Sequence, residues 1–264
     1  MSSTNDSSVM PILAHLSELR RRLIISLVAI AVATCVAFAF SGQILGWLLM
    51  PLGTMHLKAF DIMDGFMVRW RVSLYAGIVV TFPLWAYELY RYIRPALDKR
   101  AQRAVWPILL FACLLFVAGM LFAFYLLFSI VKELMLLFPP QVDFMPAADQ
   151  YLSFAVFFML ACGVVFQLPT VITILVRLGL VRAQTLSKQR RIAYFVLFAF
   201  AEVITPVADP IVAPLTVMLP LILLYEASII VAYRIEKSRA RRLKREQAEA
   251  PAPQAQLLVP SEKQ

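Results

Sequence analysis

Histidine and cysteine, which supply most transition-metal ligands and many nucleophiles, are scarce in this chain. It contains two histidines, His15 and His56, and three cysteines, Cys35, Cys113 and Cys162. The cysteines are odd in number and all lie in apolar runs, which argues against a disulfide framework, and no Cys/His spacing indicates a metal site. We therefore predict that the chain binds neither a metal nor another cofactor, and that the cysteines are small packing residues.

Motifs of the common enzyme classes are missing as well. The chain has no phosphate-binding loop of the form G-x-x-x-x-G-K-S/T, no H-E-x-x-H zinc motif and no G-x-S-x-G nucleophile elbow. These absences argue against ATP hydrolysis and against an intramembrane enzyme. We predict that the protein is not an enzyme, so any transport it performs draws on a partner or on an ion gradient.

Charged residues are few, at 16% of the chain, whereas hydrophobic residues make up 61% and the mean hydropathy is +0.79. This composition excludes an ordinary soluble domain. Six apolar runs fall near residues 23–49, 70–93, 104–131, 150–176, 192–205 and 211–233. A helix needs about 20 residues to cross the hydrocarbon of a bilayer, and the fifth run is shorter than this. We predict an all-α, polytopic membrane protein: a bundle of six transmembrane helices in a lipid bilayer.

The basic residues are distributed unevenly between the connecting segments. The chain has 25 Lys and Arg, a net charge of +9 and a pI near 9.7. All but four of them lie in the N-terminal tail, beside the second and fourth connections, or in the C-terminal tail; the four others are Lys58, Arg69, Arg71 and Lys132. The positive-inside rule then places both termini in the cytoplasm and explains the basic charge without nucleic acid. Arg69 and Arg71 depart from the rule, and we expect them to snorkel to the outer interface.

The chain divides into one membrane domain and two tails. Residues 11–235 hold the six runs, between a polar tail at 1–10 and a tail at 236–264 that is basic at first and then rich in Ala, Pro and Gln. We predict that both tails are disordered. The connectors 52–68 and 132–149 are longer than a tight turn requires, so we expect them to form small caps.

The most specific segment precedes the first run, where residues 15–23 read H-L-S-E-L-R-R-R-L. It places the carboxylate of Glu18 at the mouth of the first span, with Arg22 four residues further on. An ordinary i,i+4 ion pair would account for both residues. The pattern H-L-x-E-L-R-x-R-L before the first of six spans nevertheless resembles TatC, a subunit family of the twin-arginine translocase.

Four further segments match this family in the same order along the chain. They are Pro51-Leu52, Tyr92-Ile93-Arg94-Pro95-Ala96-Leu97, Gly163-Val164-Val165-Phe166-Gln167-Leu168-Pro169, and Thr205-Pro206 with Asp209. The resemblance covers about residues 11–235. Pro51 and Asp209 are expected to shape turns outside the membrane.

The resemblance implies a receptor for signal peptides that carry consecutive arginines. Such a protein acts with TatA- and TatB-type single-span subunits and with other copies of itself. Together they export folded proteins across the cytoplasmic membrane, using the proton-motive force. On this basis we expect a multi-pass protein of the inner cell membrane.

The resemblance also implies a cytoplasmic surface that captures the arginine motif. Its predicted members are His15, Leu16, Glu18, Leu19, Arg20, Arg22, Tyr92, Pro95 and Asp98. Planar carboxylates bind guanidinium groups best, and they are scarce on a basic face, so Glu18 is the expected acceptor. The chain departs from the family at Tyr92, where Phe is usual, and at Ala101, where a second arginine-binding Glu is usual. Asp98, about one helical turn earlier, could replace that Glu; alternatively, it pairs with Lys99 or Arg103.

Polar residues inside the runs require a specific role, because lipid does not solvate them. The resemblance implies an intramembrane, partner-binding set: Gln167, Thr205, Pro206 and Glu226. For Gln167, a hydrogen bond within the subunit is an equal alternative to a partner helix. Glu226, like Glu88 near Arg91, could instead form a structural pair with a basic residue nearer the cytoplasm.

A secondary transporter or channel for a small solute is the alternative from another class. It would need convergent charged groups or unwound helices near the middle of the membrane. Gln167 alone gives this alternative little support.

Overall fold

The computed structural model describes residues 6–53, 57–96, 105–137, 145–205 and 212–249. The regular structure within these ranges is helical apart from one isolated β-bridge, which confirms the all-α fold. In chain order the helices are α1 (Asp6–Ala39), α2 (Ser41–Leu49), the 3-10 helix η1 (Met50–Leu52), α3 (Asp64–Val80), α4 (Phe82–Ile93), the 3-10 helix η2 (Arg94–Ala96), α6 (Val105–Leu137), α7 (Ala148–Val165), α8 (Leu168–Arg177), α9 (Ala183–Lys188), α10 (Arg190–Ile204) and α11 (Val212–Glu249).

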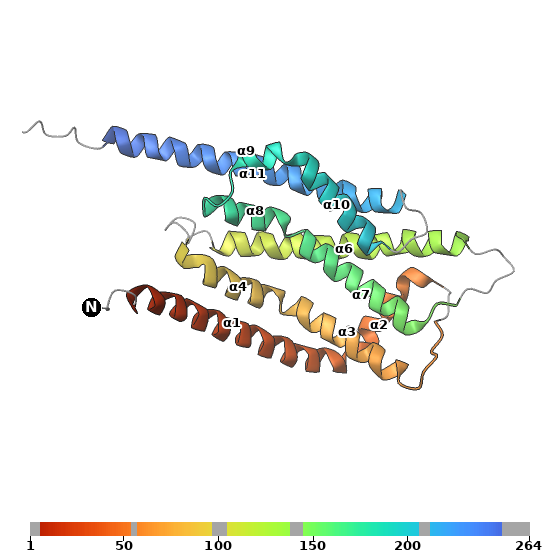
Figure 1. The fold of residues 1–264 in the computed structure, drawn as a ribbon. Coiled ribbons are helices and arrows are strands. Elements are labelled where there is room, and N and C mark those ends of the chain that lie inside the picture. Colours follow the sequence, from red (N-terminus) through yellow and green to blue (C-terminus); the bar gives the residue numbers. More distant parts are fainter. Residues whose placement is uncertain (1–5, 54–56, 97–104, 138–144, 206–211, 250–264) are drawn as a thin grey trace, which may run out of the picture.

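The long helices lie side by side along a common axis (Figure 1). The start of α1 and the end of α11 lie at the same end of this bundle, which we call the terminal end. At this end α4 and α8 also finish and α6 and α10 begin. The opposite end, where α3 and α7 begin, is called the loop end.

Four helical stretches are long and apolar enough to cross a membrane: Leu16–Ala39, Trp106–Glu133, Ala148–Arg177 and Pro214–Arg241. The pair α3 and α4, bent by 50°, makes a fifth if it is one span. Helix α10, the fifth predicted run, has 15 residues, fewer than the roughly 20 that a span needs. By length and composition, the described residues therefore support four of the six predicted spans, and a fifth if α3 and α4 form one span.

Prolines account for two breaks inside the predicted runs. Pro83 lies in the first turn of α4 and Pro169 in the first turn of α8. Proline is favoured in a first helical turn but lacks the N–H that a helix interior needs, so a new helix begins there at an angle to the last. The second break leaves Gln167 at the junction of α7 and α8.

The first predicted run, 23–49, ends too late, because α1 stops at Ala39 and residues 41–49 form the separate helix α2. Ser41 and Gly42, which follow the break, are weaker helix formers than the Ala and Leu residues around them. Pro51 lies buried in η1, directly after α2, and Gly53 follows with a φ of 62°. A positive φ is accessible to glycine without steric strain, so the chain turns there.

Both tails contain more helix than we predicted. Helix α1 begins at Asp6, inside the segment expected to be disordered. Helix α11 continues to Glu249, whereas we predicted disorder from residue 236. The segment after residue 236 is rich in Ala, Arg, Lys, Glu and Leu, which are strong helix formers, so it extends the preceding helix. Residues 250–264 lie outside the described residues.

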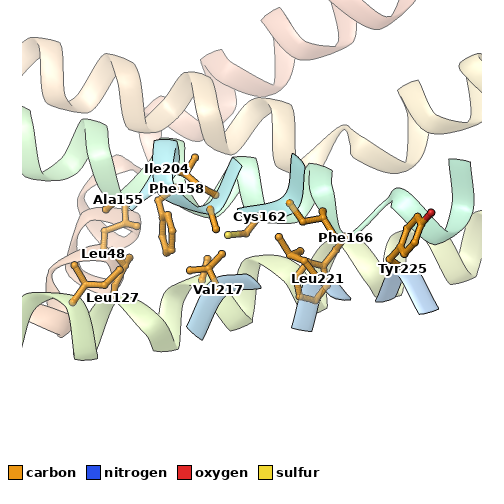
Figure 2. Packing of buried hydrophobic residues seen from close by; sticks show 14 of the residues in the cluster. Leu48, Leu127, Ala155, Phe158, Cys162, Phe166, Ile204, Val217, Leu221 and Tyr225 are labelled. Carbon is orange, nitrogen blue, oxygen red and sulfur yellow. The ribbon is translucent and has the colours of Figure 1, made fainter. Parts of the chain in front are cut away.

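The hydrophobic core lies between α6, α7 and α11, with contributions from α2 and α10 (Figure 2). Leu127 of α6, Phe158 of α7 and Val217 of α11 are each fully buried there. Cys162 lies in this core, as predicted for a packing residue, and Cys113 is half-buried. Cys35 is exposed on α1 and lies outside this core, so its packing role stays a prediction.

The described parts of the two long connectors meet at the loop end; residues 54–56 and 138–144, on which the expected caps also depend, lie outside the described residues. The backbone N–H of Lys58 donates to the carbonyl of Pro146 at 3.1 Å, and the N–H of Ala148 donates to the carbonyl of Lys58 at 3.0 Å. These two bonds form the isolated bridge between Lys58 and Ala147. They hold the start of α7 against the connector that precedes α3.

The side chain of Arg71 joins α3 to α7. Its Nη1 lies 2.8 Å from both carboxylate oxygens of Asp149 and 2.7 Å from the Ser153 hydroxyl. This ion pair reaches the start of α7 at the loop end, and the expected position of Arg71 at the outer interface stays a prediction. The carboxylate of Asp149, at the start of α7, balances the positive charge of Arg71.

We expect the Arg71–Asp149 pair to contribute modestly to stability. Its side chains are 43% and 31% exposed, and pairs of this kind contribute about 1 kcal/mol or less. A double-mutant cycle of Arg71→Ala and Asp149→Ala, followed by thermal unfolding in lipid nanodiscs, measures the coupling free energy. A coupling of zero would show that the pair does not stabilise the α3–α7 contact.

Candidate binding site at the terminal end

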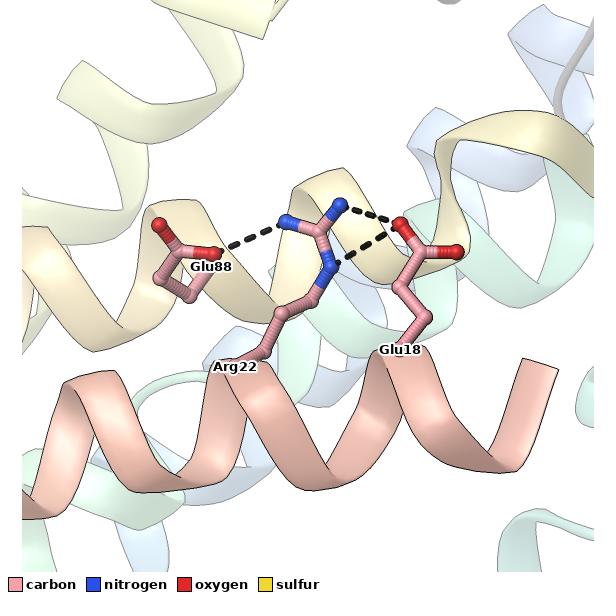
Figure 3. Close-up of polar contacts among 3 residues, drawn as sticks. All are labelled: Glu18, Arg22 and Glu88. Atoms are coloured by element: carbon pink, nitrogen blue, oxygen red, sulfur yellow. Dashed lines mark hydrogen bonds and ion pairs between the residues drawn. The ribbon is translucent and has the colours of Figure 1, made fainter. Parts of the chain in front are cut away.

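An ion-paired cluster of three side chains lies near the terminal end, between α1 and α4 (Figure 3). Glu18 and Arg22 are four residues apart on α1, so they share one face of that helix. The Arg22 guanidinium contacts Glu18 through both Nε and Nη2, the Nε bond being 3.2 Å long. Its Nη1 donates to Oε2 of Glu88 on α4 at 2.8 Å. One guanidinium is thus shared between carboxylates of two helices.

The three members of this cluster differ in their access to solvent. The side chains of Arg22 and Glu88 are 12% and 13% exposed, whereas that of Glu18 is 39% exposed. Glu18 is therefore the carboxylate that a ligand reaches first. Two carboxylates and one guanidinium give these three side chains a formal charge of −1, on a part of the chain where basic residues are otherwise concentrated.

Glu88 forms a structural pair with a basic residue, as we expected, and that residue is Arg22 of another helix. The i,i+4 spacing predicted the contact of Glu18 with Arg22. It could not predict Glu88, which lies 66 positions away in the sequence and meets Arg22 only because α1 packs against α4.

The other residues predicted for this surface lie at the same end of the bundle. Leu16, Leu19 and Arg20 are exposed on α1; at the end of α4 and in η2, Tyr92 is half-buried and Pro95 is exposed. The structure thus brings the α1 motif and the end of α4 to one region. His15 lies in α1, but its side chain is outside the description, and Asp98 and Ala101 lie outside the described residues.

Gln167 makes a hydrogen bond within the subunit. At the junction of α7 and α8, its Nε2 donates to the carbonyl of Ala112 on α6 at 2.8 Å. This is the hydrogen bond within the subunit that we expected as an equal alternative to binding of a partner helix. One turn further on, the Thr170 hydroxyl is buried and lacks a hydrogen-bond partner among the described residues.

Glu226 joins α11 to α10. Its carboxylate accepts a bond from Arg190 at 2.9 Å and from the Tyr194 hydroxyl at 2.6 Å. Arg190 begins α10 at the terminal end, so the expected structural pair of Glu226 with a basic residue toward that end is present. Thr205 is buried and donates to the carbonyl of Ala201 in its own helix. Pro206 and Asp209 lie outside the described residues.

The fold defines a multi-pass helical membrane protein, and the Glu18–Arg22–Glu88 cluster gives it carboxylates suited to binding cationic groups. The model of the family Sec-independent protein translocase protein (TatC) matches residues 14–220 of the chain. The chain is 30% identical over 226 residues to TatC of Carboxydothermus hydrogenoformans, covering 84% of this chain and 93% of that protein. It is 33% identical over 228 residues to TatC of Desulforapulum autotrophicum, covering 84% of each. The chain therefore belongs to the TatC family of protein translocases.

A solved structure agrees with this assignment. The crystal structure of the twin arginine translocase receptor TatC in DDM superposes with a TM-score of 0.74. It is 32% identical to this chain and covers 83% of it and 99% of the crystallised chain. The arrangement of helices described above is thus that of TatC, and the resemblance stated from the sequence motifs is confirmed.

Proposed function

We propose that this protein is the core receptor subunit of a twin-arginine translocation system. It binds twin-arginine signal peptides at the terminal end of the bundle, which faces the cytoplasm. With TatA- and TatB-type single-span subunits and other copies of itself, it exports folded proteins across the cytoplasmic membrane, using the proton-motive force. In this arrangement α10 is the sixth span.

The Glu18–Arg22–Glu88 cluster is the observation that carries the proposal. A guanidinium already lies between the two carboxylates, so the spot has the geometry that arginine recognition requires. The cluster holds two carboxylates and one guanidinium, and Glu18 is the more exposed of the two carboxylates. Tyr92 and Pro95 contribute the neighbouring surface that borders the bound peptide, and Asp98 is proposed from the sequence to replace the second arginine-binding Glu of the family.

We propose a second binding surface on the membrane face that includes Gln167. It docks the apolar stretch of the signal peptide or the helix of a single-span subunit. The support is a polar amide at a helix break, one turn before the buried Thr170 hydroxyl, which has no hydrogen-bond partner in the part of the chain that the structure describes. A polar group in lipid gains from a partner that completes its hydrogen bonds. Thr205, Pro206 and Glu226 belong to this proposed partner-binding set.

Binding to a labelled peptide tests the receptor function. In lipid nanodiscs, we expect the protein to bind a fluorescent twin-arginine signal peptide more tightly than its twin-lysine version, because lysine cannot form a bidentate pair. Glu18→Gln should weaken arginine-peptide binding by about tenfold or more, since a charge-assisted hydrogen bond contributes about 1.5–3 kcal/mol. Fluorescence polarisation gives both affinities.

Glu202→Gln is the matched control for Glu18→Gln. Glu202 is exposed near the end of α10 at the loop end of the bundle, so the same chemical change should leave peptide affinity unaltered. Equal affinity for the arginine and lysine peptides, or full affinity in Glu18→Gln, would contradict the proposed receptor function.

A further inference from the structure

Three apolar side chains are exposed at the loop end, in the turn that leads into α3. Phe60 is 69% exposed, Ile62 99% and Met63 61%. We call these three residues the apolar turn. They precede α3 and so lie outside the helical stretches that are long and apolar enough to cross a membrane. A contiguous group of exposed apolar side chains indicates an interaction surface.

Hydrogen bonds within the turn fix its conformation. The Asp64 carboxylate accepts the backbone N–H of Phe60 at 2.8 Å and that of Asp61 at 3.0 Å. The Asp61 carboxylate accepts the backbone N–H of Met63 at 3.2 Å. Both acids of the turn therefore bind its own backbone, and the apolar side chains are the groups that the turn presents outward.

The apolar turn continues an exposed stripe on α3. Met63, Met67, Trp70 and Leu74 are all exposed and recur every three or four residues, so they lie on one face of the helix. Val72, on another face, is buried. With α3 and α4 as one span, the exposed face meets lipid. Because the stripe runs without interruption from the span into the turn, lipid is the partner that the surface indicates.

The turn lies further toward the loop end than the end of the first span (Figure 1). Gly77 of α3 lies against Thr34 of α1. At the rise of a helix, Asp64 is about 20 Å from Gly77, whereas Ala39, the end of α1, is about 8 Å from Thr34. Headgroups extend a hydrocarbon core of about 30 Å to about 40–45 Å, so the turn lies toward the headgroup layer.

Basic and aromatic side chains accompany the turn and the stripe. The Lys58 ammonium lies over the Phe60 ring, 5.6 Å from its centroid. Arg69 is exposed on α3 beside Trp70. Tryptophan is enriched at the boundary between membrane and water, and basic residues beside an apolar surface attract the phosphates of anionic lipids. The charges around the turn are thus complementary to a lipid surface.

We propose that the apolar turn is an interfacial membrane anchor. Phe60, Ile62 and Met63 insert at the boundary between headgroups and acyl chains, and Lys58 lies among the lipid phosphates. The inserted turn fixes the depth of the start of α3 in the bilayer. This inference does not depend on the proposed receptor function, because it concerns the end of the bundle opposite to the Glu18–Arg22–Glu88 cluster.

Fluorescence quenching by labelled lipids tests the anchor. In a full-length chain whose three native cysteines are replaced by alanine, Ile62→Cys carries an NBD fluorophore, in vesicles of phosphatidylcholine and phosphatidylglycerol. Interfacial segments insert about 5–10 Å, so lipids with a nitroxide near the top of the acyl chain should quench this probe strongly. Iodide in the water should quench it weakly.

Gly65→Cys, labelled in the same way, is the matched control. Gly65 lies at a similar level, but it is about 200° around α3 from Met63 and has open space around it. We expect nitroxide quenching at residue 62 to exceed that at residue 65 at least about threefold, because the apolar turn inserts on one face only. Equal quenching at the two positions would overturn the inference.

A further variant tests whether the apolar side chains cause the insertion. Adding Phe60→Ser and Met63→Ser to the labelled Ile62→Cys chain should abolish most of the nitroxide quenching and expose the probe to iodide. Unchanged quenching would overturn the inference, because position alone would then bring the probe near lipid. Protection from iodide without nitroxide quenching would also overturn it, since a second copy or another protein would then cover the turn.

Crosslinking decides the question if the cysteine-free chain does not fold. A photoreactive benzoylphenylalanine replaces Ile62 in the otherwise native chain, and mass spectrometry identifies its adducts in the same vesicles. Phospholipid adducts are the expected result. Adducts with protein alone, or with water alone, would overturn the inference.

Discussion

Gly77→Ala is expected to lower the free energy of unfolding by about 2 kcal/mol, because α1 and α3 meet too closely at this glycine for any side chain. A Cβ atom at residue 77 would overlap the Thr34 hydroxyl oxygen and lie 2.9 Å from the Thr34 nitrogen and 3.1 Å from the Ile30 carbonyl oxygen. Two of these neighbours are backbone atoms of α1, so the helices must separate to admit a methyl group. The Thr34 hydroxyl also donates to the Ile30 carbonyl at 2.8 Å, and the new methyl group would disturb that bond.

Thermal unfolding in nanodiscs measures this change, and we expect the melting temperature to fall by about 5 °C. Gly65→Ala, in the same helix α3, is the matched control, since a Cβ there has nothing within 4 Å. Alanine has the higher helix propensity, so Gly65→Ala should be neutral or slightly stabilising. A Gly77→Ala variant as stable as Gly65→Ala would show that α1 and α3 are not in close contact.

Gly119→Ala should destabilise the protein by a similar amount, about 2–3 kcal/mol, at the contact between α6 and α7. A Cβ at residue 119 would lie 2.7 Å from Cγ of Phe166 and 2.8 Å from the Cys162 carbonyl oxygen. Phe166 is itself buried, and the carbonyl belongs to the backbone of α7, so neither can move freely. In lipid, helices associate largely through such close packing at small residues, which makes this contact sensitive to added volume.

Gly163→Ala tests the same interface from the other side. A Cβ at residue 163 would lie 3.0 Å from the Phe116 ring and 3.1 Å from the Met120 side chain. Methionine is flexible and can adapt, so we expect a loss well under that of Gly119→Ala. Equal melting temperatures for the two variants would contradict the idea that backbone contact at Gly119 decides the difference.

The helices themselves were largely predictable from the sequence, but several of their boundaries were not. Apolar runs predict helices because lipid leaves the backbone no other partner. The end of α1 at Ala39 was missed, because residues 41–49 are as apolar as those before them. The helical stretch to Glu249 was missed for the opposite reason: its charged composition suggested a solvated tail, although its residues favour helix.

The candidate site was predicted in part. The motif around Glu18 was recognisable because all of its residues lie on one short segment, and the spacing to Arg22 gives contact within any helix. A basic partner was expected for Glu88, but its identity as Arg22 was not, and neither was the pair of Arg71 with Asp149. Both are contacts between helices, which no local spacing encodes.

The sequence by itself determined that this is a multi-pass membrane protein, that it is all-helical, and that it carries the motifs of the TatC family. These properties depend on composition and on short-range patterns, which act along a single helix. Only the tertiary structure decided that Arg22 is shared between Glu18 and Glu88, and that Gly77 and Gly119 lie at close helix contacts. The physical reason is that helices apolar on all sides can pack in many rotations, so their partners are chosen by shape and by a few polar contacts between distant segments.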